Sequence, residues 1–334
     1  MGVAHKNIDA LCNKSLKRAD EVITECKKRG IRILTYDSPL YPEKLKNIFD
    51  PPYVLYVRSK ERLDLNKHLC VAVVGNREYT DYGRIVTENL AGDIAKEGVT
   101  IVSGMARGID SVAHAAALNA GGKTIAVLGC GADICYPAEN NNLMSAIIEN
   151  GMVLSEFPPG MPPLPKNFPQ RNRIISGLCL GTLVTEAAVV SGSLITANIA
   201  LEQNREVYAV PGNITNKHSE GCNLLISSLG AKVVLNAENI LEDFRDTYAE
   251  ILENNKPIIM EEKAEELIPF NERYKDLSEK EQLILKSMSA VPVHIDEIMS
   301  KTKIPSDELV STLTLLEISA MIKSHPGKMF SLNI

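Results

Sequence analysis

Short apolar stretches alternate with helical patterns through the middle of the chain, from residue 70 to residue 235. The stretches are rich in Val, Ile and Leu and are mostly apolar on both faces, which is typical of strands buried in a parallel sheet. The sequence therefore predicts an α/β fold with a doubly wound, mostly parallel sheet and right-handed crossovers. The predicted strands cover residues 70–74, 100–103, 124–128, 152–155, 182–185, 207–210 and 232–235.

Composition shifts divide the chain into four predicted parts. Residues 1–65 form a helical and strand leader packed on the main domain, which covers residues 66–240. An acidic linker follows at residues 241–276, which is expected to be helical at first and to form a tether from about residue 256. Residues 277–334 begin with a capping box, Ser278 with Glu281, and continue as three helices and a hairpin. That arrangement predicts a small C-terminal winged-helix domain.

The charge and the cysteines of the chain indicate in which compartment the protein acts and which ligands it can bind. The net charge is −6, and the acidic excess lies between residues 236 and 273, so the rest of the chain is nearly neutral and can carry a local basic groove. No apolar run is long enough to cross a bilayer, and the N-terminus lacks a signal pattern. The seven cysteines are scattered without a C-x-x-C pair. We therefore expect reduced thiols, a cytoplasmic protein, no membrane contact, and neither metal nor cofactor.

Glycine-bearing turns follow several of the predicted strands. In an open parallel sheet the loops beyond the carboxyl ends of the strands converge on one crevice. Glycines there let backbone N–H groups approach an anion, and arginines supply forked charge. The sequence therefore predicts a phosphate-binding edge built from Arg77, Ser103, Gly104, Arg107, Ser191, Gly192 and Ser193.

The most informative segment is 166–173, which follows a proline-rich approach. Phe168 has cationic and polar neighbours, which suits a stacked base beside a phosphate and adds Lys166, Phe168, Arg171, Asn172 and Arg173 to the predicted site. The alternative is that Phe168 fills the core and the arginines pair with Glu156 or Glu186. We expect Glu186 to orient one of these arginines, although its carboxylate could also serve as a base or bind a ribose.

Structural roles are expected for His114 and for the C-terminal domain. His114 is expected to pack on its helix, and no nucleophile or catalytic motif stands out, so we predict no catalytic residue. The predicted helix at residues 307–318 carries no lysine or arginine, whereas a major-groove reader should be basic. The C-terminal domain is therefore predicted to be a protein-contact or packing module rather than a reader of DNA.

Many segments, taken in order, resemble the DNA-processing protein A family, also called DprA or Smf, which acts in natural transformation. The resemblance covers residues 30–231 and 277–332. Its matching segments are Gly75-Asn76-Arg77 with Thr80 and Tyr82-Gly83, 103–110, 128–131 with Tyr136-Pro137, 155–160, 168–175, Glu186-Ala187, 191–197 and 209–212.

The resemblance implies a Rossmann-like domain that binds and protects single-stranded DNA and hands it to the RecA recombinase. It also implies a homodimer through that domain and no established catalysis. The apolar run 223–226 could serve such a dimer or equally pack on the sheet. Many members begin with a helical domain like a sterile alpha motif, and the roughly 30 residues ahead of the match are too few for one, which puts that domain's role in doubt.

Two other functions remain open at this point. The first is a nucleotide-binding Rossmann enzyme of the phosphoribohydrolase type, with Arg173 and Glu186 in the working roles, although the compact Pro-Gly-Gly-x-Gly-Thr loop of those enzymes is missing. The second is a transcription regulator that acts through the C-terminal domain.

Overall fold

The computed structural model describes residues 15–257, 277–288, 293–319, 321–325 and 327–332. The chain divides into two compact units, residues 1–258 and 259–334. The first unit carries the groove described below.

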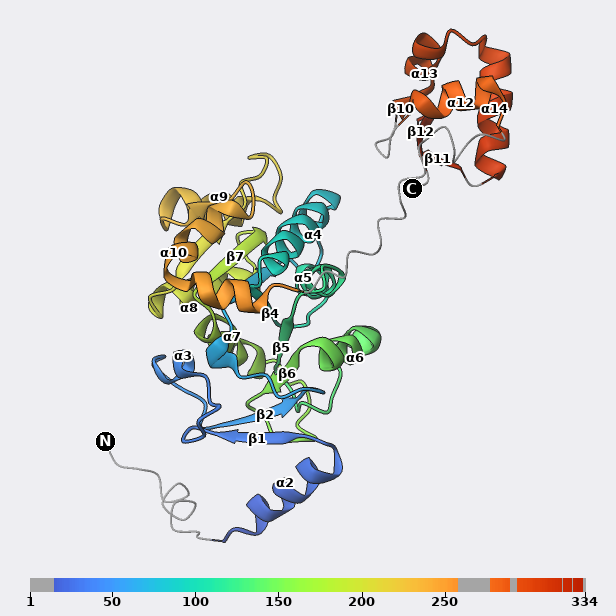
Figure 1. Ribbon diagram of the computed structural model, residues 1–334. Helices are drawn as coiled ribbons and strands as arrows, with labels where there is room; N and C mark the ends of the chain where they lie inside the picture. Colours follow the sequence, from blue (N-terminus) through green and yellow to red (C-terminus); the bar gives the residue numbers. More distant parts are fainter. Residues whose placement is uncertain (1–14, 258–276, 289–292, 320, 326, 333–334) are drawn as a thin grey trace. The chain divides into compact units, whose positions relative to one another are not determined.

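The described part of the first unit is built around one nine-stranded sheet with the order β1-β2-β6-β5-β4-β3-β7-β8-β9 (Figure 1). The strands from β6 to β9 run parallel, whereas β1 and β2 are antiparallel to their neighbours. The strands are β1 (Arg32–Thr35), β2 (Val54–Arg58), β3 (Cys70–Gly75), β4 (Thr100–Ser103), β5 (Thr124–Leu128), β6 (Met152–Ser155), β7 (Gly181–Glu186), β8 (Glu206–Ala209) and β9 (Lys232–Val233).

Helices cover both faces of this sheet, because alternate strand residues face opposite sides and both sides are apolar. Val71 and Val73 pack under α4, α5 and α10, while Ala72 and Val74 pack under α7, α8 and α9. The helices of this unit are α2 (Lys17–Lys28), α3 (Glu43–Lys46), η1 (Leu65–Lys67), α4 (Asp81–Lys96), α5 (Ile109–Asn119), η2 (Ala138–Asn140), α6 (Asn141–Asn150), α7 (Asn167–Leu178), α8 (Gly192–Glu202), α9 (Glu220–Ser228) and α10 (Glu238–Asn255).

The predicted α/β fold is confirmed. Strands β1 and β2, which belong to the predicted leader, extend the main sheet as its antiparallel edge. The acidic region is helical as far as Asn255, as expected of its first part, since α10 buries Leu241, Phe244 and Leu252 against the core at helical spacing. The first 14 residues of the helix expected over residues 1–30, and the expected tether from residue 258 on, lie outside the described residues.

The second unit has the winged-helix elements that the sequence predicts. They are α12 (Glu279–Lys286), β10 (Val293–His294), α13 (Ile295–Thr302), α14 (Ser306–Ile318), β11 (Ile322–His325) and β12 (Met329–Leu332). The hydroxyl of Ser278 accepts a hydrogen bond from the Glu281 amide and the Glu281 carboxylate accepts from the Ser278 amide, which completes the predicted capping box. Among the described residues, no helix combines the length and apolarity needed to cross a bilayer.

Candidate nucleic-acid interface

A groove of about 720 Å³ opens at the carboxyl ends of the parallel strands. The strand order reverses between β3 and β7, because the chain runs outward from β3 to β6 and then returns to β7 on the other side. Ligands of open α/β sheets bind at such a reversal. Residues 74–78 after β3 and residues 190–193 after β7 line the groove, which we call the switch-point groove.

The strand-end glycines let neighbouring loops pack closely. A Cβ atom on Gly75 would lie 2.6 Å from a side-chain carbon of Ile109. Gly108 has a φ of +87°, and a Cβ there would collide with the backbone carbonyls of Asn76 and Arg77. The Ile109 amide instead donates to the Asn76 carbonyl over 3.1 Å. These glycines therefore set the shape of the groove wall.

The loop at residues 103–108 differs from the anion nest that the sequence predicts. The buried Ser103 hydroxyl donates to the Val73 carbonyl over 2.6 Å, which ties β4 to β3. The amides of Gly104 and Ala106 both donate to the carboxylate of Asp110, at 3.1 and 3.3 Å. Ser103 and the Gly104 amide are thus occupied within the protein, because the carboxylate of Asp110, in the first turn of α5 (Ile109–Asn119), takes the place of an external anion.

Arg171 is buried rather than presented to solvent, with 5% of its surface exposed. Its guanidinium donates to the carbonyls of Gly104, at 2.7 Å, and Val127. Burial lowers the pKa of Arg171 and raises the pKa of nearby Asp110, and the opposite charge of each acts against the shift of the other. Arg171 thus links the ends of β4 and β5 from within, and its guanidinium is engaged by protein carbonyls rather than free for a phosphate.

Two further arginines of the predicted site are held by carboxylates. Arg173 donates to Glu156 over 3.0 Å and to Asp50 over 3.1 Å, and 12% of its side chain is exposed. Arg107 is exposed and forms a two-point pair with Glu139, 3.0 Å at one contact. The alternative in which an arginine pairs with Glu156 thus holds for Arg173.

Glu186 does not orient an arginine. Its buried carboxylate accepts a hydrogen bond from the Thr80 amide over 3.0 Å and another from the Thr80 hydroxyl. Thr80 is the N-cap of α4, so this carboxylate fastens the end of β7 to the start of that helix. His114 behaves as expected: it is buried, its Nδ1 lies 2.6 Å from the Thr124 hydroxyl, and burial lowers its pKa to about 3.

Phe168 and Arg77 form the chemically distinctive part of the switch-point groove. The Phe168 ring is half-buried and lies 5.7 Å, between ring centroids, from the half-exposed ring of Tyr136. The guanidinium carbon of Arg77 lies 6.0 Å from the Phe168 centroid. Arg77 is exposed and forms no ion pair with any residue that the structure describes. A ring pair beside a cation can accept a flat, neutral ring that is joined to an anionic group.

The opposite wall is the start of α8. Ser191 caps this helix by accepting a hydrogen bond from the Ser193 amide over 3.4 Å, and Gly192 is exposed beside it. Asn172 projects into the groove from α7, and its side-chain oxygen accepts from Arg171 over 3.1 Å. The groove thus has a helix N-terminus on one side and a ring pair on the other.

The structure brings part of the predicted site together. Arg77, Phe168, Arg171, Asn172 and the turn at 191–193 line the groove, whereas Ser103, Gly104, Arg107, Lys166 and Arg173 do not. Lys166 is exposed at the start of α7 and forms no ion pair among the described residues. Whether any of these side chains contacts DNA stays a prediction.

Sequence reasoning did not single out three groove residues as binding residues. Tyr136 was part of a matching motif but not of the predicted site, although aromatic residues are sparse in a chain with no Trp. His218 arrives from the loop after β8, where its Nδ1 lies 3.2 Å from the Asn76 side-chain amide. Val190, 98% exposed at the groove edge, carries no local sequence signal.

Two family models match the chain. The model described as DNA recombination-mediator protein A matches residues 32–245, and the model described as the DprA winged helix domain matches residues 269–328. The first match contains all the residues that line the groove, and the second contains most of the described second unit.

A named relative and a solved structure are similar to this chain and support the same family. Protein Smf of Synechocystis is 34% identical over 345 residues, covering 98% of this chain and 86% of the relative. The X-ray structure of DNA processing protein A from Streptococcus pneumoniae superposes with a TM-score of 0.62 at 42% identity, covering 66% of this chain and 77% of the other.

A structure of DNA processing protein A from Helicobacter pylori, reported for its single-stranded DNA binding mode, superposes with a TM-score of 0.59 at 30% identity. It covers 66% of this chain and 99% of the other. Matches of this length, in both units of the chain, are not produced by a shared fold alone. The chain belongs to the family of DNA recombination-mediator protein A, the DprA or Smf family.

Proposed function

We propose that this chain binds single-stranded DNA in the switch-point groove. The observation that carries the proposal is the accessible Phe168 ring with the unpaired Arg77 guanidinium 6.0 Å from its centre. An unpaired base offers a face to the ring, and its phosphate offers charge to the arginine. The Helicobacter pylori relative, which is described as binding single-stranded DNA, supports the same ligand class.

The groove favours an unpaired strand over a duplex for a geometric reason. Stacking on Phe168 or Tyr136 requires a base whose face is free, and a duplex buries that face between neighbouring pairs. The described first unit presents no row of forked side chains of the kind that reads base edges in a major groove. We therefore expect binding that tolerates any sequence.

A wider role follows from the family. We propose that the protein protects incoming DNA during natural transformation, helps to load RecA and acts in the cytoplasm. The match to a recombination-mediator family supports the role in DNA processing. The unpaired thiols of the described cysteines support the cytoplasmic location, where thiols stay reduced. RecA loading requires a partner assay: strand exchange by RecA on coated single-stranded DNA should speed up when this protein is added.

We also propose a homodimer through the Rossmann-like domain. In α9, Leu225 packs into the core while Leu224 stays 40% exposed, and the exposed Leu229, Val233 and Leu235 follow along the chain. Such apolar side chains are typical of an interface when they gather on one surface. Light scattering at two protein concentrations should give twice the monomer mass, and a monomer at both would end this proposal.

The groove is proposed to bind without catalysis. The enzyme alternative gave the working roles to Arg173 and Glu186, and both are engaged by protein groups and lie outside the groove. Incubation with nucleoside monophosphates should release no free base, and release of base would revive the phosphoribohydrolase alternative.

The proposed ligand is tested by a salt-titrated binding assay with three probes: a single-stranded oligonucleotide, its duplex and a mononucleotide. We expect the single strand to bind most tightly and its affinity to fall steeply with salt, because phosphate contacts release counterions. If the mononucleotide bound as tightly as the single strand, the groove would instead be a nucleotide site.

Phe168→Ala should weaken binding of single-stranded DNA by roughly 1–3 kcal/mol, the range measured for loss of one base–aromatic stack. The salt slope should hardly change, because no charge is removed. Tyr53→Ala is the matched control, since Tyr53 is 76% exposed and does not line the groove. If Phe168→Ala binds as tightly as the unaltered protein, the ring is not a stacking platform.

A further inference from the structure

A second cavity lies at the opposite end of the parallel strands from the switch-point groove. Its volume is about 320 Å³, and its walls come from β1, β2 and the first residue of β6, Met152. Arg58 at the end of β2 is near this position because it pairs with Val153. The cavity therefore opens at the amino ends of the parallel strands, beside the edge strand β1.

The floor of this cavity is aliphatic and its rim is cationic. Ile33, Leu34, Leu40, Val57, Leu63 and Met152 line the floor, and Arg32 and Arg62 complete the lining. Neither guanidinium forms an ion pair with a carboxylate in the part of the chain that the structure describes. Arg32 is instead held in place by the Ser59 hydroxyl and by the Glu61 carbonyl, which accepts from it over 3.1 Å.

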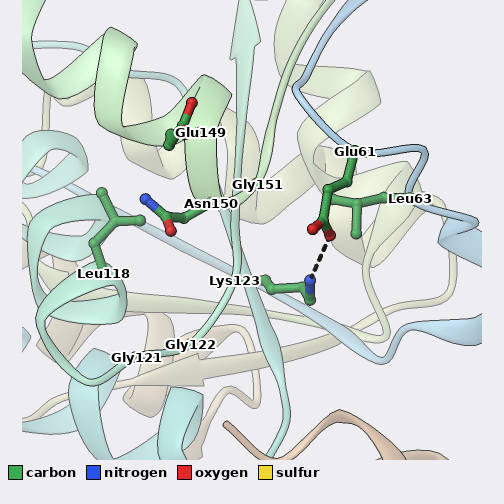
Figure 2. Close-up of a pocket in the computed structure, with 9 residues that line it drawn as sticks. All are labelled: Glu61, Leu63, Leu118, Gly121, Gly122, Lys123, Glu149, Asn150 and Gly151. Atoms are coloured by element: carbon green, nitrogen blue, oxygen red, sulfur yellow. Dashed lines mark ion pairs between the residues drawn. The ribbon is translucent and has the colours of Figure 1, made fainter. Parts of the chain in front are cut away.

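The acidic side chain next to Arg62 in the sequence, Glu61, is paired with a lysine rather than with either arginine of the rim. Glu61 points to Lys123 across an adjoining cavity, with 4.0 Å between the charged atoms (Figure 2). Leu63 lines both cavities and lies between them. Burial and the positive charge of Arg62 lower the pKa of Arg32. Two like charges thus lie together over an apolar floor, an arrangement that an external carboxylate would stabilise.

We propose that this cavity docks an extended acidic peptide of a partner protein. One apolar side chain enters the aliphatic floor, and carboxylates on either side of it pair with Arg32 and Arg62. The volume is at the low end for small-molecule sites, roughly 300–1,000 Å³, and matches an anchoring side chain better than a whole cofactor. Apolar anchors in pockets with charged rims are a common form of peptide recognition.

DNA is the less suitable occupant of this cavity. No aromatic ring lines it, so a base would have no stacking partner, and the aliphatic floor offers nothing to a phosphate. The site also lies at the amino ends of the parallel strands, whereas the groove lies at their carboxyl ends, so both can be filled at once. The proposal does not depend on the proposed DNA-binding function.

The test is a selection from a phage-displayed library of random linear peptides on the full chain. We expect enriched peptides in which carboxylates flank a large apolar residue. A synthetic peptide of the enriched sequence should bind about tenfold or more weakly to Arg62→Glu, because a rim cation becomes a repelling anion. Arg84→Glu is the matched control: Arg84 is partly exposed on α4 and does not line the cavity, so this variant should bind the peptide normally.

A binding assay with single-stranded DNA distinguishes the peptide-site proposal from the DNA-binding proposal. Arg62→Glu should bind single-stranded DNA like the unaltered protein. A loss of DNA affinity would place Arg62 in the nucleic-acid interface and overturn the peptide site. Enrichment of peptides without carboxylates, absence of any enriched sequence, or equal binding by Arg62→Glu would overturn it as well.

Discussion

Arg77→Glu is expected to weaken binding of single-stranded DNA at least about tenfold. Arg77 is exposed, has no carboxylate partner among the described residues and lies beside the Phe168 ring. Charge reversal replaces attraction to a phosphate with repulsion. The slope of log affinity against log salt should fall by about 0.7 for each phosphate that the protein no longer neutralises. Anisotropy of a labelled oligonucleotide at several salt concentrations measures both quantities.

Arg84→Glu provides the matched charge reversal for this experiment. Arg84 is bound to Glu88 at 2.9 Å on α4 and does not line the groove, so its reversal should change affinity much less. Equal losses of affinity in the two variants would mean that only the overall charge matters. Unchanged affinity in Arg77→Glu would remove Arg77 from the interface.

Arg171→Ala should lower the free energy of unfolding by about 3–5 kcal/mol, the cost typical of removing one member of a buried charge network. The substitution leaves the carbonyls of Gly104 and Val127 without their donor, and Asp110 loses its nearby positive charge. Urea denaturation followed by circular dichroism measures the change. DNA binding should fall only as far as the folded fraction falls.

Arg107→Ala is the control for stability, because Arg107 is exposed and its pair with Glu139 is screened by water. It should leave the unfolding midpoint nearly unchanged. A stable Arg171→Ala protein that no longer binds DNA would show that Arg171 is a phosphate ligand after all, contrary to the hydrogen bonds that bury it.

The sheet could be predicted from the sequence because strands 70–75, 100–103 and 124–128 are apolar on both faces, and only a two-sided sheet buries them. The convergence of loops at one edge followed from the parallel order. The sequence did not predict the direction in which each side chain of these loops points. Residues 168 and 172 share one face of α7, whereas 173 lies on another, and the proline-rich approach concealed that this segment is helical.

Short polar side chains account for the other differences between the predicted site and the observed one. Ser103 and Asp110 have the composition of an anion site, yet each satisfies backbone groups of neighbouring strands and loops. The same residue types serve both purposes, since a carboxylate accepts from free amides as readily as an external phosphate does. Only the fold decides whether the amides are already occupied.

A tryptophan placed at Phe168 tests the central claim most directly, because the chain contains no other tryptophan. Addition of single-stranded DNA to Phe168→Trp should quench the fluorescence saturably as a base stacks on the indole, and added salt should reverse the quenching. Tyr53→Trp, outside the groove, should show no such change. If Phe168→Trp binds the strand with unchanged fluorescence, the DNA lies elsewhere and the account of this groove is wrong.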